Sequence, residues 1–236
     1  MPKKFLASII GLIFLFSFVG CDNYSPSHRG FSKLEQIKHE GKLKVLTRKA
    51  PTTYYEGANG LTGLEYDLVT LFANRLNVKI EFTIPDTFDD ILTLISEGKS
   101  DIAAAGLTIT EQREQIMRFA PSYQSITEQV VYRSGRKKPQ NVNDLSRGII
   151  EIVKGTSYVD SLLKLQTDNP ALNWNLNSEL NTDGMMYLVN EGLIDYTIVD
   201  SHQASAIKRF YPKLNTAFDI TEPRQLAWAI PKSKDD

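Results

Sequence analysis

The chain has 236 residues, with 27 Lys and Arg residues against 28 Asp and Glu residues. This length allows one large domain or two small lobes. The composition is neither strongly basic nor poor in apolar residues, so it predicts no nucleic-acid binding. The three histidines are scattered, and the sequence has no Cys/His metal spacing and no glycine-rich phosphate loop, so we expect neither a metal nor another cofactor.

Residues 1–20 are typical of a secretory signal peptide. Two lysines precede an uncharged, mainly apolar run from Phe5 to Val19, which is short for a membrane-spanning helix. The segment Phe18-Val19-Gly20-Cys21 resembles the lipobox of bacterial lipoproteins, and this resemblance implies lipidation of Cys21. Ordinary signal cleavage is the alternative. Residues 21–40 would then form a lipidated tether and a short helix at 31–39, and the mature chain would carry 25 basic and 28 acidic residues.

Beyond residue 40, strand and helix patterns alternate in the rhythm of a parallel sheet with helices on its faces. Apolar alternation predicts strands at 42–47 and 79–84, and helical spacing predicts helices at 63–76 and 88–97. The run of small apolar residues at 101–105 is predicted to be a buried strand that ends at Gly106.

The second half repeats this order, which predicts two α/β lobes. Expected strands lie at 127–133, 148–154, 173–177, 193–199 and 225–230, and expected helices at 158–165, 182–190 and 201–210. The expected domains are lobe 1 at 41–132, lobe 2 at 133–220, and a return to an apparently truncated lobe 1 at 221–236.

A candidate anion site follows the buried strand. Thr110 is predicted to cap the next helix, and Arg113 stands where a capping box would carry Glu or Gln. A cation at the positive end of a helix is unfavourable unless an anion lies nearby. Free N–H groups, the Thr108 hydroxyl and Arg113 therefore predict a carboxylate pocket. The alternative is an exposed Arg113 paired with Glu111 or Glu114.

The second half offers complementary groups. The turn Gly155-Thr156-Ser157 precedes a helix, so its N–H groups and hydroxyls could contact a ligand, although many such turns bind nothing. Asp200 ends a predicted strand at the edge where α/β proteins bind ligands, or it simply caps the following helix. Arg113 and Asp200 together could hold a zwitterion. The aromatic residues that could wall such a pocket, or belong to the core instead, are Tyr54, Tyr55, Phe88 and Trp228.

Serial motifs in this chain resemble the landmarks of type 2 periplasmic solute-binding proteins for amino acids. The resemblance is carried, in chain order, by Gly63-Leu64-Glu65-Tyr66-Asp67-Leu68, Gly98-Lys99-Ser100-Asp101, Gly106 through Arg113, Phe119-Ala120-Pro121-Ser122-Tyr123, Gly155-Thr156-Ser157, Gly192-Leu193-Ile194-Asp195 and Val199-Asp200. It implies a two-lobed α/β fold, each lobe a mostly parallel sheet flanked by helices, with a hinge at 127–133 and 220–224. The loop 48–57 is similar to one in the sensor-like domain of membrane-bound lytic murein transglycosylases.

The resemblance also implies roles for single residues. Arg113 would clamp the ligand carboxylate, helped by Thr108 and Ser157, and Asp200 would accept the ammonium. Phe88 would pack on the ligand, and the remaining expected binding residues are Gly106, Thr156, Tyr54 and Tyr55. Ala105 and Gly106 replace polar residues that are common in lysine and arginine binders, which favours a smaller or less polar ligand.

Three functions follow as hypotheses. The first is a lipid-anchored, periplasmic, sensor-like domain for an amino acid or short murein-derived peptide. The second is the binding protein of an amino-acid ABC importer. The third is an enzyme on this fold, such as a dehydratase, with Glu56 or Glu65 as its acid.

The murein enzymes resemble two-part proteins with a lysozyme-like catalytic domain, which nothing after Pro231 could supply. We therefore expect a fragment, a truncated product or a stand-alone paralogue that is not itself an enzyme. The expected partners are a small-molecule ligand, the inner or outer membrane through the lipid, and murein or an ABC permease. The chain is expected to be a monomer.

Overall fold

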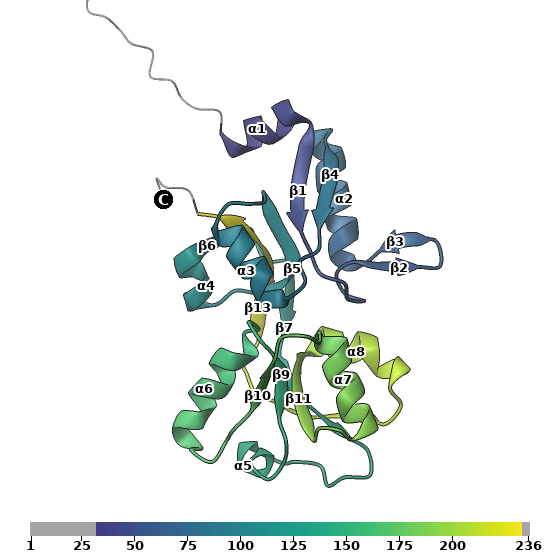
Figure 1. The fold of residues 1–236 in the computed structure, drawn as a ribbon, viewed down its shortest axis with the longest axis vertical. Coiled ribbons are helices and arrows are strands. Elements are labelled where there is room, and N and C mark those ends of the chain that lie inside the picture. The colour runs from purple at the N-terminus through teal and green to yellow at the C-terminus, as the bar shows by residue number, and fades with distance from the viewer. Residues whose placement is uncertain (1–31, 233–236) are drawn as a thin grey trace, which may run out of the picture.

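The computed structural model describes residues 32–232, so the predicted signal peptide and the predicted lipidation site at Cys21 lie outside the described residues. Within 32–232, no helix combines the length and apolar character needed to cross a membrane. The chain folds into two lobes, stacked one above the other in Figure 1, and each lobe contains sheet and flanking helices. This confirms the expected two-lobed α/β fold.

Lobe 1 is built on a six-stranded sheet in the order β4-β1-β5-β13-β6, with β7 also paired to β13. Strands β4, β1 and β5 are parallel, whereas β13 runs antiparallel to β5, β6 and β7. The strands are β1 (Lys42–Leu46), β4 (Lys79–Thr83), β5 (Ile102–Thr108), β6 (Met117–Phe119), β7 (Gln124–Ile126) and β13 (Arg224–Pro231). A separate hairpin pairs β2 (Tyr55–Gly57) with β3 (Gly60–Thr62) and projects from this lobe (Figure 1).

The helices of lobe 1 cover both faces of its sheet. They are α1 (Lys33–Glu40), α2 (Leu64–Leu76), α3 (Phe88–Ser96) and α4 (Glu111–Ile116). All of β5 is buried, because it lies inside the sheet between two cores. Ala103 and Ala105 pack with Ile91 and Ile95 of α3, while Ala104 packs with the α2 side of the sheet.

The prediction that β5 ends at Gly106 is wrong. Gly106 adopts φ +67, a left-handed conformation that glycine tolerates, and the strand continues to Thr108. The continuation is possible because β13 pairs with β5 on both sides of the glycine, with Leu226 opposite Thr108 and Ala229 opposite Ala103. The register of this pair shifts between Ala227 and Ala229. The glycine therefore interrupts the regular register of the strand without terminating it.

Lobe 2 combines a parallel pair, β10-β9, with an antiparallel set, β11-β8-β12, so the expectation of a mostly parallel sheet is wrong for this lobe. A bridge between Ile150 and Tyr196 links the two sets. The strands are β8 (Glu128–Arg133), β9 (Glu151–Val153), β10 (Asn175–Asn177), β11 (Tyr196–Asp200) and β12 (Leu214–Asp219). The helices are α5 (Val142–Leu145), α6 (Tyr158–Asp168), α7 (Thr182–Glu191), α8 (Ser201–Ile207) and the 3-10 turn η1 (Lys208–Phe210).

The chain crosses between the lobes twice. Thr127 separates β7 of lobe 1 from β8 of lobe 2, and residues 220–223 separate β12 from β13. These crossings lie within the two segments predicted as a hinge, but β8 pairs with β11 and β12, so lobe 2 starts at Glu128 rather than at residue 133 as predicted. Both ends of the described chain, α1 and the end of β13, lie in lobe 1 (Figure 1).

Candidate ligand-binding site

Arg113 is held at the start of α4 with its guanidinium directed toward lobe 2. The Thr110 hydroxyl accepts a hydrogen bond from the Arg113 N–H at 3.3 Å, as a helix cap does. The side chain is buried: Nη1 donates to the Thr108 carbonyl at 2.8 Å, and Nη2 donates to the Gly155 carbonyl at 3.1 Å. Burial lowers the pKa of Arg113 to about 10, so the guanidinium stays charged at neutral pH. An exposed Arg113 paired with Glu111 or Glu114 is therefore excluded.

The turn after β9 brings lobe 2 against this arginine. Gly155 has φ +79, and a Cβ atom there would lie 2.7 Å from Oδ1 of Asp89 on α3. Lys154 forms an ion pair with Asp89 at 3.0 Å. The Thr156 hydroxyl donates to the Val153 carbonyl at 2.7 Å, so it stabilises the turn itself. Close approach of the lobes thus depends on a residue without a side chain at position 155.

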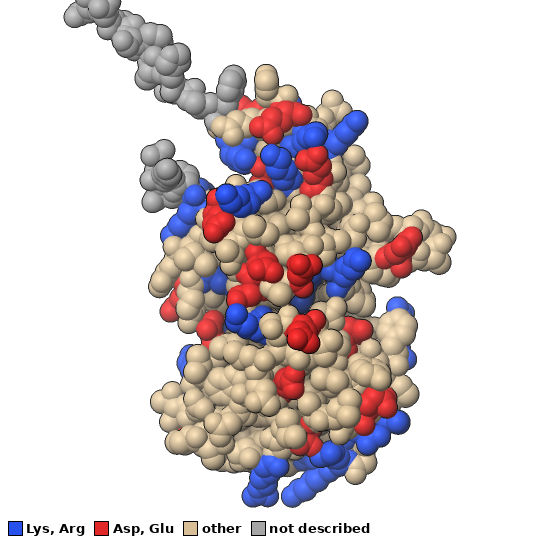
Figure 2. All heavy atoms as spheres, in the orientation of Figure 1, with Lys and Arg blue, Asp and Glu red and all other residues tan. Residues whose placement is uncertain are grey.

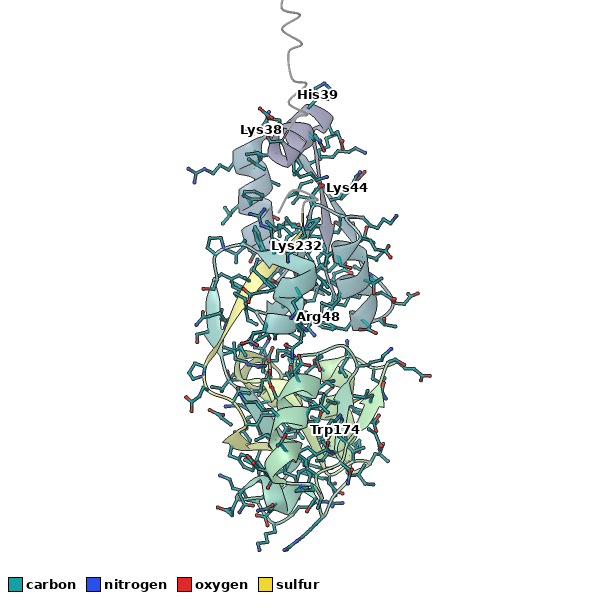
Figure 3. The ribbon with its side chains drawn as sticks, turned by 90° about the vertical axis from the view of Figure 1, so that its left-hand side faces the viewer. Lys38, His39, Lys44, Arg48, Trp174 and Lys232 are labelled. Carbon is teal, nitrogen blue, oxygen red and sulfur yellow. The ribbon has the colours of Figure 1, made fainter. Side chains whose placement is uncertain are left out.

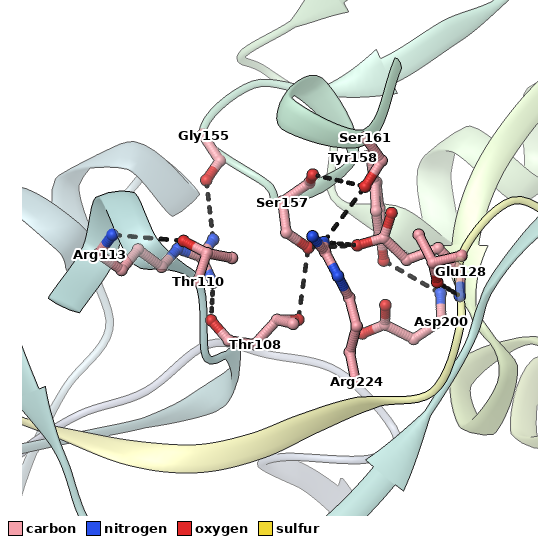
Figure 4. A network of polar contacts seen from close by, with 11 residues as sticks. Thr108, Thr110, Arg113, Glu128, Gly155, Ser157, Tyr158, Ser161, Asp200 and Arg224 are labelled. Carbon is pink, nitrogen blue, oxygen red and sulfur yellow. Dashed lines mark hydrogen bonds and ion pairs between the residues drawn. The ribbon is translucent and has the colours of Figure 1, made fainter. Parts of the chain in front are cut away.

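Ser157 of lobe 2 contacts Thr108 of lobe 1 and also the ion pair between Glu128 and Arg224. Its Oγ lies 3.3 Å from Oγ1 of Thr108 and donates to Oε1 of Glu128 at 2.7 Å. Glu128 is fully buried, and its Oε1 also accepts from Nη1 of Arg224 at 2.8 Å. Arg224 in turn donates to Oγ of Ser161 at 3.2 Å. Figure 4 shows this network, which ties α6 to the two strands at which the chain crosses between lobes.

Asp200 closes the site from the end of β11. It occupies the N-cap position of α8, but its side chain makes no capping hydrogen bond. Oδ2 accepts from Nε2 of Gln203 at 3.3 Å, whereas Oδ1 is buried and has no hydrogen-bond partner among residues 32–232. Burial raises the pKa of Asp200 to about 7, although the charge of Arg48 acts in the opposite direction. The carboxylate is therefore costly to ionise until a cation approaches it.

A small cavity of about 10 Å³ lies between these groups. The predicted binding residues that line it are Phe88, Gly106, Thr108, Arg113, Thr156, Ser157 and Asp200, and Arg48 and Tyr158 complete the lining. Tyr54 and Tyr55 line a neighbouring cavity of about 760 Å³ instead. Trp228 packs against Phe72 in lobe 1 and does not line either cavity. Figure 2 shows charged side chains of both signs at the level where the lobes meet.

Glu65, predicted only as a candidate acid of the enzyme alternative, is a buried carboxylate that supports Gly106. Oε2 of Glu65 accepts from the Gly106 N–H at 2.7 Å, and Oε1 accepts from the Tyr123 hydroxyl at 2.6 Å. Burial raises the pKa of Glu65 to about 7. The sequence feature that could have identified Glu65 as buried is its position on α2, because it shares one face of the helix with the buried residues Val69 and Ala73.

Arg48, Glu128 and Arg224 were also absent from the predicted site. Arg48 follows β1 at the cleft edge of the parallel strands, and Figure 3 shows it between the two lobes. Glu128 and Arg224 start the two crossing strands. A charged residue at the carboxyl end of a parallel strand was the available signal for Arg48.

Two α/β lobes joined by two crossings, with a polar cavity between them, define a two-lobed solute-binding protein. Residues 42–205 match the bacterial extracellular solute-binding proteins, family 3, and the chain belongs to that family.

Curated relatives include two membrane-bound lytic murein transglycosylases F. The one from Saccharophagus degradans is 37% identical over 235 residues, which cover 100% of this chain and 46% of the relative. The one from Stutzerimonas stutzeri is 38% identical over 206 residues, which cover 87% of this chain and 42% of the relative. The chain thus spans about half the length of the curated relatives that it matches. The match to a solute-binding family agrees with the expectation of a binding domain rather than a catalytic one.

Solved structures share the fold. An arginine-bound, truncated arginine-binding protein from T. maritima has a TM-score of 0.73 at 23% identity, covering 84% of this chain and 91% of that one. An ancestral arginine-binding protein bound to arginine has a TM-score of 0.73 at 25% identity, covering 83% of this chain and 86% of that one.

Proposed function

We propose that this chain is a lipid-anchored, periplasmic, sensor-like domain that binds an amino acid or a short murein-derived peptide between its lobes. The observation that carries this proposal is the placement of Arg113 and Asp200, from different lobes, on one cavity. Arg113 offers a buried cation, and Asp200 offers a buried carboxylate oxygen without a partner in the described chain. The carboxylate of a zwitterionic ligand would pair with Arg113, and its ammonium group would pair with Asp200.

Ligand entry requires the lobes to separate. A cavity of about 10 Å³ has room for no more than about one water molecule. The polar contacts that cross the cleft include Arg113 to Gly155, Lys154 to Asp89, Ser157 to Thr108 at 3.3 Å, and Asn181 to the Lys49 carbonyl at 3.4 Å. The Lys154–Asp89 and Asn181 contacts are exposed and therefore weak, so a hinge motion at the two crossings chiefly has to break the buried contacts of Arg113 and Ser157.

The expected affinity follows from the charged contacts. Hydrogen bonds to charged groups contribute roughly 1.5–3 kcal/mol each, and micromolar binding corresponds to roughly −8 kcal/mol. A carboxylate on Arg113 and an ammonium on Asp200 supply much of that after the cost of ordering the ligand. The murein part of the proposal is supported by the names of the curated relatives, and the lipid anchor by the sequence around Cys21.

Calorimetry tests the binding role. The full chain is titrated with the common amino acids and with short murein-derived peptides, alongside Arg113→Ala and the control Arg75→Ala, whose side chain is exposed on α2. We expect Arg113→Ala to lose about 3–5 kcal/mol of binding free energy, because the ligand carboxylate stays buried and unpaired. Arg75→Ala should bind as the parent does. Equal binding by Arg113→Ala and the parent chain would falsify the carboxylate role.

A further inference from the structure

Arg48 places a second guanidinium in the cavity. Its Cζ atom lies 5.1 Å from the centre of the Phe88 ring, and Cζ of Arg113 lies 5.8 Å from the same point. Gly106 leaves room for it, because a Cβ atom at position 106 would lie 3.1 Å from Nη2 of Arg48. The expected space for a ligand beside Gly106 is therefore occupied in part by an arginine of the chain itself. Two cations against one ring repel each other unless anions lie between or beside them.

The Arg48 guanidinium forms no ion pair or hydrogen bond with any residue from 32 to 232, and its Nε is buried without a partner. Both oxygens of Glu65 already accept hydrogen bonds from Gly106 and Tyr123. Asp200 has one free oxygen, but a ligand ammonium requires it in the function proposed above. Arg48 as a whole is only partly buried, but its Nε is buried without a partner among these residues, which is costly, so a ligand group that accepts from this side chain gains affinity.

A wider cavity of about 380 Å³ adjoins this point. Arg48 and Phe88 line both it and the small cavity, so the Arg48 guanidinium stands between the two spaces. The lining of the wider cavity also includes Lys49 and the acidic residues Asp86 and Glu179, so Arg48 is the cation that faces both spaces. A ligand held by Arg113 and Asp200 would therefore extend its side chain, or its next residue, past Arg48.

We propose that Arg48 selects ligands with a second carboxylate, namely an acidic amino acid or a peptide with an acidic side chain, and disfavours cationic ones. This inference rests on the proposed function of the same site. The first carboxylate pairs with Arg113, the ammonium with Asp200, and the second carboxylate with Arg48. A lysine or arginine side chain would instead meet a fixed positive charge.

The test compares L-glutamate, L-glutamine and L-arginine, which are respectively acidic, neutral and basic, by calorimetry on the full chain. The variants are Arg48→Gln and the control Lys79→Gln, which removes an exposed charge that lines neither cavity. We expect the parent to bind glutamate about tenfold to a hundredfold more tightly than glutamine, and arginine most weakly. Arg48→Gln should bring glutamate and glutamine within about twofold and should strengthen arginine binding, whereas Lys79→Gln should keep the preference of the parent. The dipeptides alanyl-glutamate and alanyl-glutamine extend the comparison to peptides.

Two results would overturn the inference in distinguishable ways. If the parent binds glutamine as tightly as glutamate, or if Arg48→Gln keeps the glutamate preference, Arg48 is not the selective group, while the proposed binding function stands. Such a result would mean that Glu65 neutralises Arg48 across the cavity. If neither the parent nor Arg48→Gln binds any amino acid or dipeptide, the proposed function and this inference fail together.

Discussion

Arg113 and Gly155 lie in different lobes, and Nη2 of Arg113 donates a hydrogen bond to the Gly155 carbonyl at 3.1 Å. The residue proposed to clamp the ligand carboxylate therefore also holds the lobes together. A ligand carboxylate accepts hydrogen bonds more strongly than a neutral carbonyl does. Ligand binding and lobe closure should consequently be coupled through this one guanidinium.

Replacing Gly155 should impair closure. Gly155→Ala would place a methyl group 2.7 Å from Oδ1 and 3.1 Å from Cα of Asp89, so the lobes could not approach as closely. Gly135→Ala is a matched control, because Gly135 also has positive φ, at +85, but has no atom within 4 Å of an added Cβ. Both variants should lose roughly 1 kcal/mol of stability from the left-handed backbone.

Small-angle scattering and calorimetry on these two glycine variants separate the effect on lobe closure from the general effect of a strained backbone. Gly155→Ala should give a larger radius of gyration with ligand present and an affinity about tenfold lower, as expected for a contact error at a closing interface. Gly135→Ala should match the parent chain in both measurements. Parental closure by Gly155→Ala would show that the turn does not limit the approach of the lobes.

Asp200→Asn should change stability and binding in opposite directions. Asparagine keeps an oxygen for Gln203 and removes a buried carboxylate whose pKa burial raises to about 7. Above pH 7 the variant should be more stable than the parent by roughly 2–4 kcal/mol at most, and near pH 4 the difference should vanish because the parent carboxyl is then protonated. Amino-acid binding should weaken at least about tenfold, because the ammonium loses its counter-charge.

Urea denaturation at pH 4 and pH 8 measures the predicted change in the free energy of unfolding of Asp200→Asn, with Asp168→Asn as an exposed control. Calorimetry at pH 8 measures the predicted loss of ligand affinity. A variant that loses stability at pH 8 would mean that the Asp200 charge is favourably paired in the folded chain.

Glu65 should make the folded chain less stable as the pH rises. Its folded pKa is about 7 and lies above the ordinary value, so between about pH 4 and 7 the folded state binds the proton that the unfolded state has lost. Stability should therefore fall through this window, by up to about 3 kcal/mol from this group. Glu65→Gln keeps an acceptor for Gly106 and a donor toward Tyr123, and it should flatten the curve. Denaturation midpoints at pH 5, 6.5 and 8 test this, and an unchanged slope in Glu65→Gln would refute it.

The Glu128–Arg224 pair should contribute more to the free energy of unfolding than an exposed ion pair does. Glu128→Gln leaves Arg224 and Ser157 without their buried carboxylate, and since Arg224 is partly exposed, we expect a loss of about 2–3 kcal/mol. The control is Glu81→Gln, which removes the exposed Lys42–Glu81 pair of 2.7 Å and should leave stability close to that of the parent. Chemical denaturation compares the two variants, and equal losses would argue against a structural role at the crossings.

The helices and most strands could be predicted because their patterns are local. Apolar spacing identified α2 and α3, and the run before Gly106 identified a buried strand. Strand β12 and the short strands β6 and β7 were not predicted, because their pairing partners β8 and β13 lie far away in sequence. Gly106 was misread as a strand end for the same reason.

The site was predictable where a local anomaly pointed to it. Arg113 stood at a helix start that ordinarily favours an acid, and Asp200 followed an apolar strand. Arg48 and Glu65 gave weaker signals, namely a charge after a parallel strand and an acid on the buried face of a helix. Their importance arises because folding buries one charge beside the cavity and the other behind Gly106, which depends on contacts between distant segments.

Both ends of the described chain belong to lobe 1, and lobe 2 is reached through the two crossings alone. Any anchor or neighbouring domain attached at those ends would be connected to lobe 1, so lobe 2 could still rotate about the two crossings. Movement of lobe 2 on capturing a ligand would then be transmitted along β13, which runs from the hinge to the last described residues. The conformational change caused by ligand binding would therefore reach a neighbouring domain through the carboxyl end of this strand rather than through the cleft.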